Sequence, residues 1–208
     1  MSTFANAGGD IAPVEPVVEA VEESTGAFYL GLAYGAANYD FTHTYHCDST
    51  GTDIIPGDFD YDTVMLQAGY KFNPYIALEG RYWIGLDENI GNAEDLNIDT
   101  WGIYVKPMYP VTNTFDIYAL LGYASSDRSN LDDTIVSTSA EPLPYRTSYD
   151  MDGFSWGIGA AYAFTDNFSL FVDYTSLYDD DDTFADSDES WKYEDEITSW
   201  NFGVTYTF

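Results

Sequence analysis

Apolar residues occupy every second position in eight segments of this chain between Gly26 and Phe208. A two-residue period is that of a β-strand whose two faces meet different surroundings. In residues 154–164, for example, large apolar side chains alternate with Gly, Ala and Ser. Most segments have about the 9 to 11 residues that a tilted strand needs to cross a bilayer. The pattern predicts strands within residues 28–36, 64–72, 76–86, 100–109, 115–123, 154–164, 169–175 and 199–208.

The connections between these segments alternate in length. Residues 73–74, 111–113 and 165–167 are short enough for hairpin turns. Long polar connections separate the hairpins, at residues 37–58, 87–95, 125–149 and 179–192. Short turns on one rim and long loops on the other predict an all-β fold, an eight-stranded antiparallel up-and-down transmembrane β-barrel. A two-sheet sandwich is the alternative, but its outward face would carry Lys and Glu rather than Gly and Ala.

Aromatic side chains gather near both ends of the predicted strands, as they do at membrane interfaces. One group should mark the rim with the short turns, namely Phe72, Tyr75, Tyr109, Phe115, Phe164, Phe168, Tyr206 and Phe208. A second group should mark the opposite rim, namely Tyr34, Tyr61, Tyr82, Trp101, Tyr123, Trp156, Tyr174 and Trp200.

Charge is strongly unbalanced, with 36 acidic and 6 basic residues and a formal net charge of −30. This charge repels phosphate backbones, which excludes nucleic acid as a partner. Six charged residues lie within the predicted strands, all on the face with small and polar side chains: Lys71, Glu79, Arg81, Lys106, Asp116 and Asp173. Buried charges require partners, so we expect a salt-bridge network that fills the lumen as a polar, charged plug. The alternative is a gate, in which an exchange of partners opens a narrow ion path.

The last predicted strand carries a further signature. From Trp200 to Phe208, aromatic and aliphatic residues alternate with small polar ones, and the final residue is Phe. With the preceding pattern, residues 26–208 resemble the eight-stranded outer-membrane barrels, meaning the OmpA-like transmembrane domain, OmpX and opacity-type proteins. The resemblance implies that Phe208 belongs to a signal read by the barrel assembly machinery. It also implies contact with outer-membrane lipids and lipopolysaccharide, extracellular long loops and periplasmic termini.

The first 25 residues differ from the rest. Ala5 and Ala7 stand in the arrangement of a signal-peptide cleavage site, so we interpret residues 1–7 as a signal-peptide remnant; an ordinary frayed terminus is the alternative. Residues 8–25 are rich in Pro, Val and Glu, a composition that predicts a flexible periplasmic leader. No apolar run is long enough for a transmembrane helix.

An acidic run in the last long connection is a candidate site for weakly bound Ca²⁺ or Mg²⁺, because both cations prefer oxygen ligands. Its carboxylates are Asp179, Asp180, Asp181, Asp182, Asp186, Asp188 and Glu189. Their spacing does not match an EF-hand loop, and a solvated, self-repelling loop is the competing interpretation. Such a loop would also attract a cationic extracellular partner or bridge to lipopolysaccharide phosphates through cations. We expect no other cofactor and no dedicated metal site.

His43, His46 and Cys47 stand close together in the first long connection. This trio contains Zn²⁺ and Cu²⁺ ligand types without a fourth ligand at fixed spacing, and a chance cluster is the competing interpretation. His46 with Ser49 and an acid would be the residues of a lipid-modifying hydrolase, although no nucleophile motif is present. We expect a non-enzymatic barrel with a structural or surface-interaction role. The alternatives are a narrow cation-preferring porin and the hydrolase.

Overall fold

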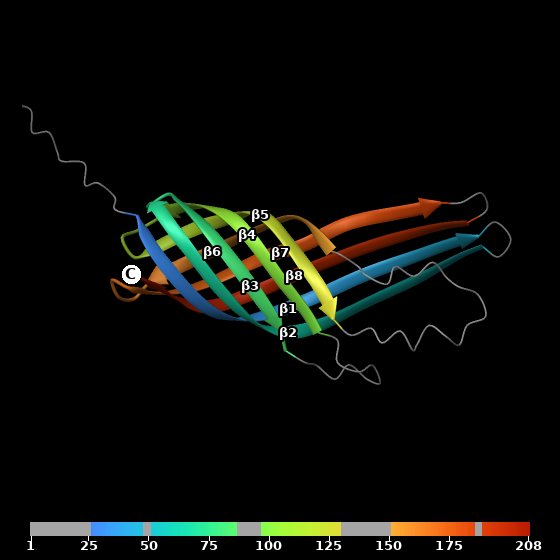
Figure 1. Ribbon diagram of the computed structural model, residues 1–208, viewed down its shortest axis with the longest axis horizontal. Helices are drawn as coiled ribbons and strands as arrows, with labels where there is room; N and C mark the ends of the chain where they lie inside the picture. Colours follow the sequence, from blue (N-terminus) through green and yellow to red (C-terminus); the bar gives the residue numbers. More distant parts are fainter. Residues whose placement is uncertain (1–25, 48–50, 87–96, 130–150, 186–188) are drawn as a thin grey trace, which may run out of the picture.

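The computed structural model describes residues 26–47, 51–86, 97–129, 151–185 and 189–208. Within these residues eight strands form one closed barrel in chain order, each antiparallel to its neighbours (Figure 1). The strands are β1 (Ala27–Cys47), β2 (Gly51–Asn73), β3 (Ile76–Gly85), β4 (Asn97–Pro110), β5 (Phe115–Ser129), β6 (Met151–Ala163), β7 (Phe168–Ala185) and β8 (Glu189–Thr207). The predicted signal remnant 1–7 and leader 8–25 lie outside the described residues. No helix in the described part is long and apolar enough to span a membrane.

The predicted inward and outward alternation is confirmed in the barrel wall. Leu32 on β1 and Ile158 on β6 point outward, with exposed fractions of 55% and 59%. Ala33, next to Leu32 on β1, and Ser155 on β6 point inward and are buried. The barrel therefore exposes a band of apolar side chains on its outside and encloses small, polar and charged ones together with several bulky rings.

The three predicted short turns are also confirmed, and all lie at one end of the barrel. The Asn73 side chain accepts hydrogen bonds from the backbone N–H groups of Tyr75 (2.8 Å) and Ile76 (3.1 Å). Thr165 accepts one from the N–H of Phe168 (2.9 Å). Hydrogen bonds of this kind, accepted by Asn and Thr side chains, stabilise tight turns. The turns at this end of the barrel are therefore determined by residues within the turns themselves.

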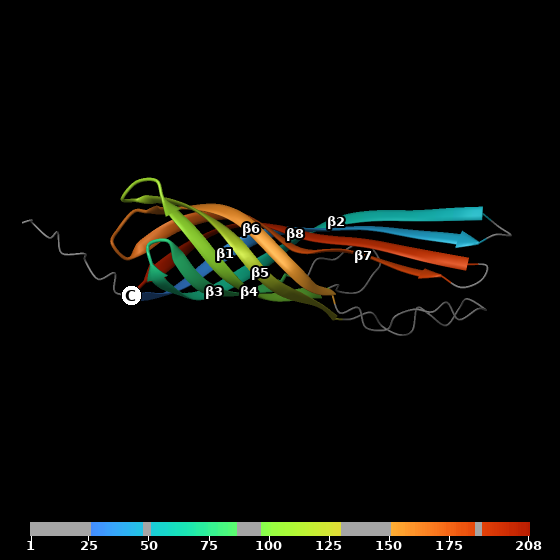
Figure 2. The same cartoon turned by 90° about the horizontal axis from the view of Figure 1, so that it is seen from above.

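The other end differs from the prediction, because two of the expected loops are mostly strand. β1 and β2 pair continuously from Ala27↔Lys71 to Cys47↔Gly51, and β1 and β8 pair as far as Cys47↔Glu189. The extended parts of β1, β2, β7 and β8 run well beyond the other four strands (Figures 1 and 2). We call residues 38–47, 51–60, 178–185 and 189–197 the projecting sheet. The prediction of loops at 37–58 and 179–192 is therefore wrong.

The faces of these strands change character where the projecting sheet begins. On β1 the outward positions are apolar up to Tyr34 and Ala36 and polar from Asn38 onward. The inward positions are small from Gly31 to Ala37 and carry rings from Tyr39 to Tyr45. The strand period continues without interruption, but the apolar face moves from the outside to the inside. We call the two sides of the projecting sheet its inner face and its outer face.

The aromatic residues of the short-turn rim point outward largely as predicted; Phe72, Tyr109 and Phe208 are all more than half exposed. On the opposite rim one assignment needs correction. Tyr61 is buried, with an exposed fraction of 7%, because its odd position in the β2 alternation turns its ring inward with that of Phe59.

Candidate functional sites: the lumen network and the projecting sheet

Arg81 occupies the centre of the barrel lumen. Glu79 and Arg81 are two residues apart on β3, so both side chains point inward, and both are buried. Arg81 donates from Nε to Glu79 (2.6 Å) and through Nη1 and Nη2 to both oxygens of Asp173 (3.0 and 2.7 Å). Because β3 and β7 stand opposite each other in the ring, this bidentate pair spans the lumen.

A second cation completes the charge balance. Lys106 on β4 donates from Nζ to Glu79 at 2.8 Å and lies 4.0 Å from the ring centre of Tyr118. Tyr29 donates its hydroxyl to the same Glu79 oxygen at 2.6 Å. Two carboxylates and two cations thus neutralise one another in the interior. We call Glu79, Arg81, Lys106 and Asp173 the lumen network.

Neutral polar side chains satisfy the remaining oxygens. Asp173 accepts from the Tyr118 hydroxyl (2.8 Å) and from Nδ2 of Asn201 (2.9 Å). The amide oxygen of Asn201 in turn accepts from Nε1 of Trp83 (2.8 Å). Sequence analysis did not identify these partners. The alternation along each strand predicts that these residues point inward. Which inward residues meet across the lumen depends on the stagger between strands.

The lumen network is smaller than predicted. Lys71 is half-buried, and its Nζ lies 5.8 Å from the ring centre of Tyr29. Asp116 is also half-buried near the short-turn end. Among the described residues neither forms an ion pair within 4.0 Å. Both side chains lie close to the open end of the barrel, where water replaces the partner that a deeper charge needs.

Bulky side chains fill the space around the lumen network. Trp83, Tyr104 and Phe171 surround the guanidinium of Arg81, each with its ring centre about 6 Å away. All three rings are buried. An eight-stranded barrel has an interior just wide enough for side chains, and here charged and aromatic groups occupy the mid-level of that interior.

The outer face of the projecting sheet is acidic. A hollow of about 450 Å³ lies over β7, β8 and β1. Its charged lining consists of the outer-face residues Asp40, Asp179, Asp181, Glu194 and Glu196, the inner-register residues Asp180 and Asp195, and one cation, Lys192. Lys192 contacts Glu194 at 2.6 Å and Asp181 at 3.8 Å. Partial burial, with the nearby charges of Asp179 and Asp40, raises the pKa of Glu196 above its usual value.

The structure divides the candidate calcium or magnesium ligands between two faces. Alternation along β7 places Asp179 and Asp181 on the outer face and Asp180 and Asp182 on the inner face. Glu189 begins β8 and accepts a hydrogen bond from the Tyr45 hydroxyl (3.0 Å), whereas Asp186 and Asp188 lie outside the described residues. No three His, Cys, Asp or Glu side chains of the described part converge as metal ligands. The described carboxylates therefore do not form the compact cluster that a loop would allow.

Aromatic rings form a continuous row on the inner face. Tyr39 packs against Phe59 and Phe41, with ring centres 5.1 and 5.6 Å apart. His43 lies between Phe41 (5.0 Å) and Tyr193 (4.8 Å). Tyr45 and Trp191 form a further pair at 5.6 Å. We call these seven residues the aromatic row.

The predicted grouping of His43, His46 and Cys47 is not found. His43 and Cys47 lie on the inner face, whereas His46 points to the outer face and its Nδ1 lies 2.8 Å from the Thr52 hydroxyl. The strand conformation separates side chains that a loop would have allowed to converge. Ser49, the nucleophile of the hydrolase alternative, lies outside the described residues.

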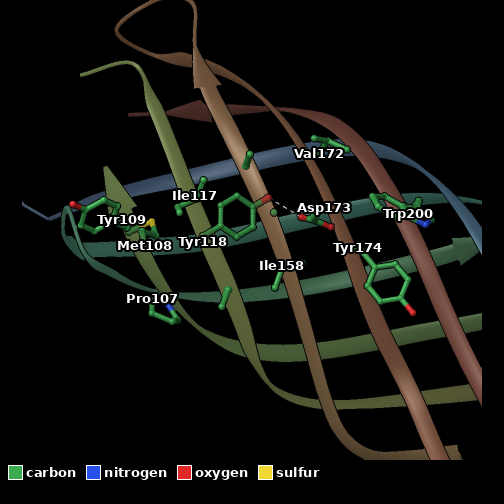
Figure 3. Close-up of a pocket in the computed structure, with 13 residues that line it drawn as sticks. Pro107, Met108, Tyr109, Ile117, Tyr118, Ile158, Val172, Asp173, Tyr174 and Trp200 are labelled. Atoms are coloured by element: carbon green, nitrogen blue, oxygen red, sulfur yellow. Dashed lines mark hydrogen bonds between the residues drawn. The ribbon is translucent and has the colours of Figure 1, made fainter. Parts of the chain in front are cut away.

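A hollow of about 680 Å³ opens in the outward wall over β4 to β7 (Figure 3). Pairing between β4 and β5 is interrupted there between Val105↔Leu121 and Met108↔Tyr118, and Pro107 within the gap has no N–H to donate. Ile117, Ile158 and Val172 line the hollow. Its one charged lining residue, Asp173, is engaged by Arg81, so the hollow lacks the converging polar groups of a specific small-molecule site.

Comparisons with known proteins agree with this architecture. The sequence model of the outer membrane protein beta-barrel domain family matches residues 14–208. The chain is similar to the crystal structure of the outer membrane protein OprG from Pseudomonas aeruginosa, with 14% identity over 89% of this chain and 97% of that chain, and a TM-score of 0.59. It is also similar to Neisserial surface protein A, with 14% identity, 88% and 99% coverage, and a TM-score of 0.53. No curated protein matches the sequence.

Proposed function

The chain belongs to the outer membrane protein beta-barrel domain family, and on this premise we propose that it is a closed, non-enzymatic barrel that carries the projecting sheet on the cell surface. In this orientation the short turns and both termini face the periplasm. The change of faces along β1 supports this orientation. Its outward residues are apolar as far as Ala36, and the next outward residues, Asn38 and Asp40, are polar. Acidic side chains on the outer face need water around them.

The lumen network supports the proposed closed state. Opening an ion path would separate Arg81 from Asp173, and each buried charge would lose its partner. Breaking a buried pair by removing one partner costs about 3–5 kcal/mol. This bidentate contact across the lumen is the observation that carries the closed-barrel proposal.

Planar-bilayer conductance of the purified chain tests this proposal. We expect no steady current, because the lumen network and its surrounding rings block the path. The porin alternative predicts a steady current with a cation-selective reversal potential under a salt gradient, since an acidic mouth concentrates cations. A cation-selective current in the unmodified protein would refute the closed barrel.

The hydrolase alternative is tested separately. We propose that His46 has no catalytic role, and its contact with Thr52 on the outer face supports a local structural one. His46→Ala should therefore leave the folded barrel unchanged, as judged by heat-modifiable migration. Lipid turnover by the parent protein that disappears in this variant would overturn the non-enzymatic assignment.

Phe208 is proposed to contribute to assembly by the barrel assembly machinery. Its backbone N–H donates to the carbonyl of Phe28 (3.0 Å), and its ring packs on Tyr206 with ring centres 5.0 Å apart. Phe208 therefore adds a contact at the seam between β1 and β8. Phe208→Ala keeps the backbone bond and removes the ring, so slower insertion of an otherwise stable barrel would indicate recognition of the aromatic side chain.

The projecting sheet is the proposed interaction element. Its acidic outer face suits cations that bridge to lipopolysaccharide phosphates, and the sheet as a whole suits a cationic partner. Calorimetric titration with Ca²⁺ and Mg²⁺ tests the first of these roles. Absence of binding heat in the millimolar range would exclude the divalent bridge and leave the barrel assignment intact.

A further inference from the structure

The edges of the projecting sheet are poorly suited to pairing with another strand. β3 pairs with β2 only as far as Thr63↔Gly85, and β6 pairs with β7 only as far as Trp156↔Ser176. Among the described residues, β2 and β7 are edge strands beyond these points. The β7 edge carries four consecutive Asp residues, 179–182, and the β2 edge carries Pro56. Charges and Pro on edges oppose strand addition, so a partner would have to bind a face.

The inner face combines two features that complement a cation. It presents the aromatic row, most of whose rings are half-buried and so retain accessible surface. The register also assigns five carboxylates to this face and no Lys or Arg. These carboxylates are Asp53, Asp180, Asp182, Glu189 and Asp195. Asp195 is buried, accepts from the Tyr39 hydroxyl and lies 3.8 Å from Nε2 of His43. Glu189 accepts from Tyr45, so the attraction for a bound cation rests on the carboxylates at the two borders of the face.

The outer face has a different composition. Its carboxylates already hold one cation, Lys192, which contacts Glu194 and Asp181. Its positions on β1 and β8 carry Asn, Asp, Thr, His, Ser, Lys and Glu, with no Phe, Tyr or Trp. Both faces attract positive charge, but only the inner face offers aromatic surface on which a cationic side chain can pack.

We propose that the inner face of the projecting sheet binds an extended peptide rich in Lys or Arg. Cationic heads would lie over the rings of Tyr45, Trp191 and Tyr193, with Asp180 and Asp182 at one border and Asp53 at the other. The contact of Lys106 with the Tyr118 ring at 4.0 Å shows the same chemistry inside the barrel. This inference rests on the proposed surface role, and it adds the partner class and the face that binds it.

The acidic run of β7 provides a matched test. Asp180→Asn with Asp182→Asn removes two charges from the inner face, and Asp179→Asn with Asp181→Asn removes two from the outer face of the same strand. The full chain in zwitterionic lipid nanodiscs is titrated with a fluorescently labelled short oligolysine peptide at physiological ionic strength. We expect the inner pair to weaken binding about tenfold and the outer pair less than about twofold, because only the inner pair would contact the bound peptide, and exposed charges without direct contact contribute little.

Two further measurements separate the alternatives. Trp191→Ala should weaken binding about two- to fivefold through loss of a cation–π contact. An oligolysine peptide methylated on its backbone nitrogens should bind as tightly as the parent peptide, because a face does not require backbone hydrogen bonds. Heat-modifiable migration of each variant confirms that the barrel remains folded.

Several results would overturn the inference. Equal losses for the two Asp pairs would indicate general attraction to the net charge of −30. Loss of binding on backbone methylation would indicate strand addition at an edge, and absence of binding by the parent protein would leave the inner face without this partner. None of these results alters the conductance test, so this inference can fail while the closed barrel stands.

Discussion

Four of the eight wall strands, β1, β2, β7 and β8, continue into the projecting sheet, and their apolar side chains change faces where it begins. In the wall, Leu32 points outward and is more than half exposed, whereas its neighbour Ala33 is buried. Farther along β1, Asp40 points outward and the Tyr39 ring is buried on the inner side. Both regions are therefore strand, with side chains that alternate between the two faces. In the proposed orientation, the face that carries the apolar side chains matches the surroundings of each region, lipid for the wall and water for the projecting sheet.

The interiors of the two regions differ as well. The barrel encloses paired charges, with Arg81 held by Glu79 and Asp173. The inner face of the projecting sheet carries tilted and edge-on ring pairs and carboxylates without Lys or Arg. Buried charges need complete pairing, whereas half-buried rings tolerate water. We therefore expect substitutions to have large effects in the lumen and small effects on the projecting sheet.

The largest expected effect is in the lumen network. Arg81→Leu leaves Asp173 buried without its cation, which should lower the free energy of unfolding by about 3–5 kcal/mol. Lys71→Met, on the same face but without an ion pair among the described residues, should cost less than about 1 kcal/mol. Denaturant unfolding in lipid vesicles measures both. Equal losses of unfolding free energy in the two variants would show that the lumen network contributes no more to stability than an unpaired inward charge.

The next prediction compares outward positions in the two regions. Ile158→Lys places a charge against lipid and should cost about 2–4 kcal/mol. Thr42→Lys places the same charge on the outer face, where its register partner on β8 is Glu194, and should change stability by less than about 0.5 kcal/mol. The same unfolding measurement applies. A large cost at Thr42 would mean that the projecting sheet is not in water.

A pH change should affect the projecting sheet in one direction. The pKa of Glu196 in the folded chain is raised above its unfolded value, so the group favours the fold most below its unfolded pKa. This contribution is lost as the pH rises through the folded pKa. Amide hydrogen exchange in residues 192–197 should therefore slow when the pH falls from about 7 to about 5, after correction for intrinsic rates. Glu196→Gln should weaken this dependence, and an unchanged dependence would assign it to another group.

The smallest effect is expected at Lys192. Its contacts with Glu194 and Asp181 are on the surface, and exposed ion pairs contribute about 0–1 kcal/mol. Lys192→Met should therefore destabilise the projecting sheet only slightly, and added salt should reduce the difference. A loss as large as that of Arg81→Leu would contradict the contrast between the two regions.

The eight strands and their inward faces were predictable because each wall strand alternates large apolar residues with small or polar ones. The projecting sheet was not, because Asp40 and the run from Asp179 to Asp182 resemble a solvated loop, although Tyr39, Phe41 and His43 continue the two-residue period. That run of odd-numbered aromatic residues was the available signal. It indicates a strand once the apolar face is allowed to change sides.

The charged members of the lumen network could be predicted from their inward parity, but their partners could not. Glu79 and Arg81 are adjacent on one face of a strand, so their contact follows from local geometry. The contact of Arg81 with Asp173, 92 residues away, depends on the stagger and closure of the whole barrel. Lys71 and Asp116 also point inward but lie near the open end of the barrel. The alternation along a strand predicts which face a residue is on, but not how deep in the barrel it lies.

The inversion of the faces along β1 is tested most directly by spin labels placed one at a time at Leu30, Leu32, Thr42 and Thr44 in lipid bilayers. Collision with oxygen reports hydrocarbon, and collision with a water-soluble nickel chelate reports water. Labels at Leu30 and Leu32 should collide mainly with oxygen, and labels at Thr42 and Thr44 mainly with the chelate. Oxygen-dominated collisions at all four positions would contradict the account, because the outer face would then lie in the membrane.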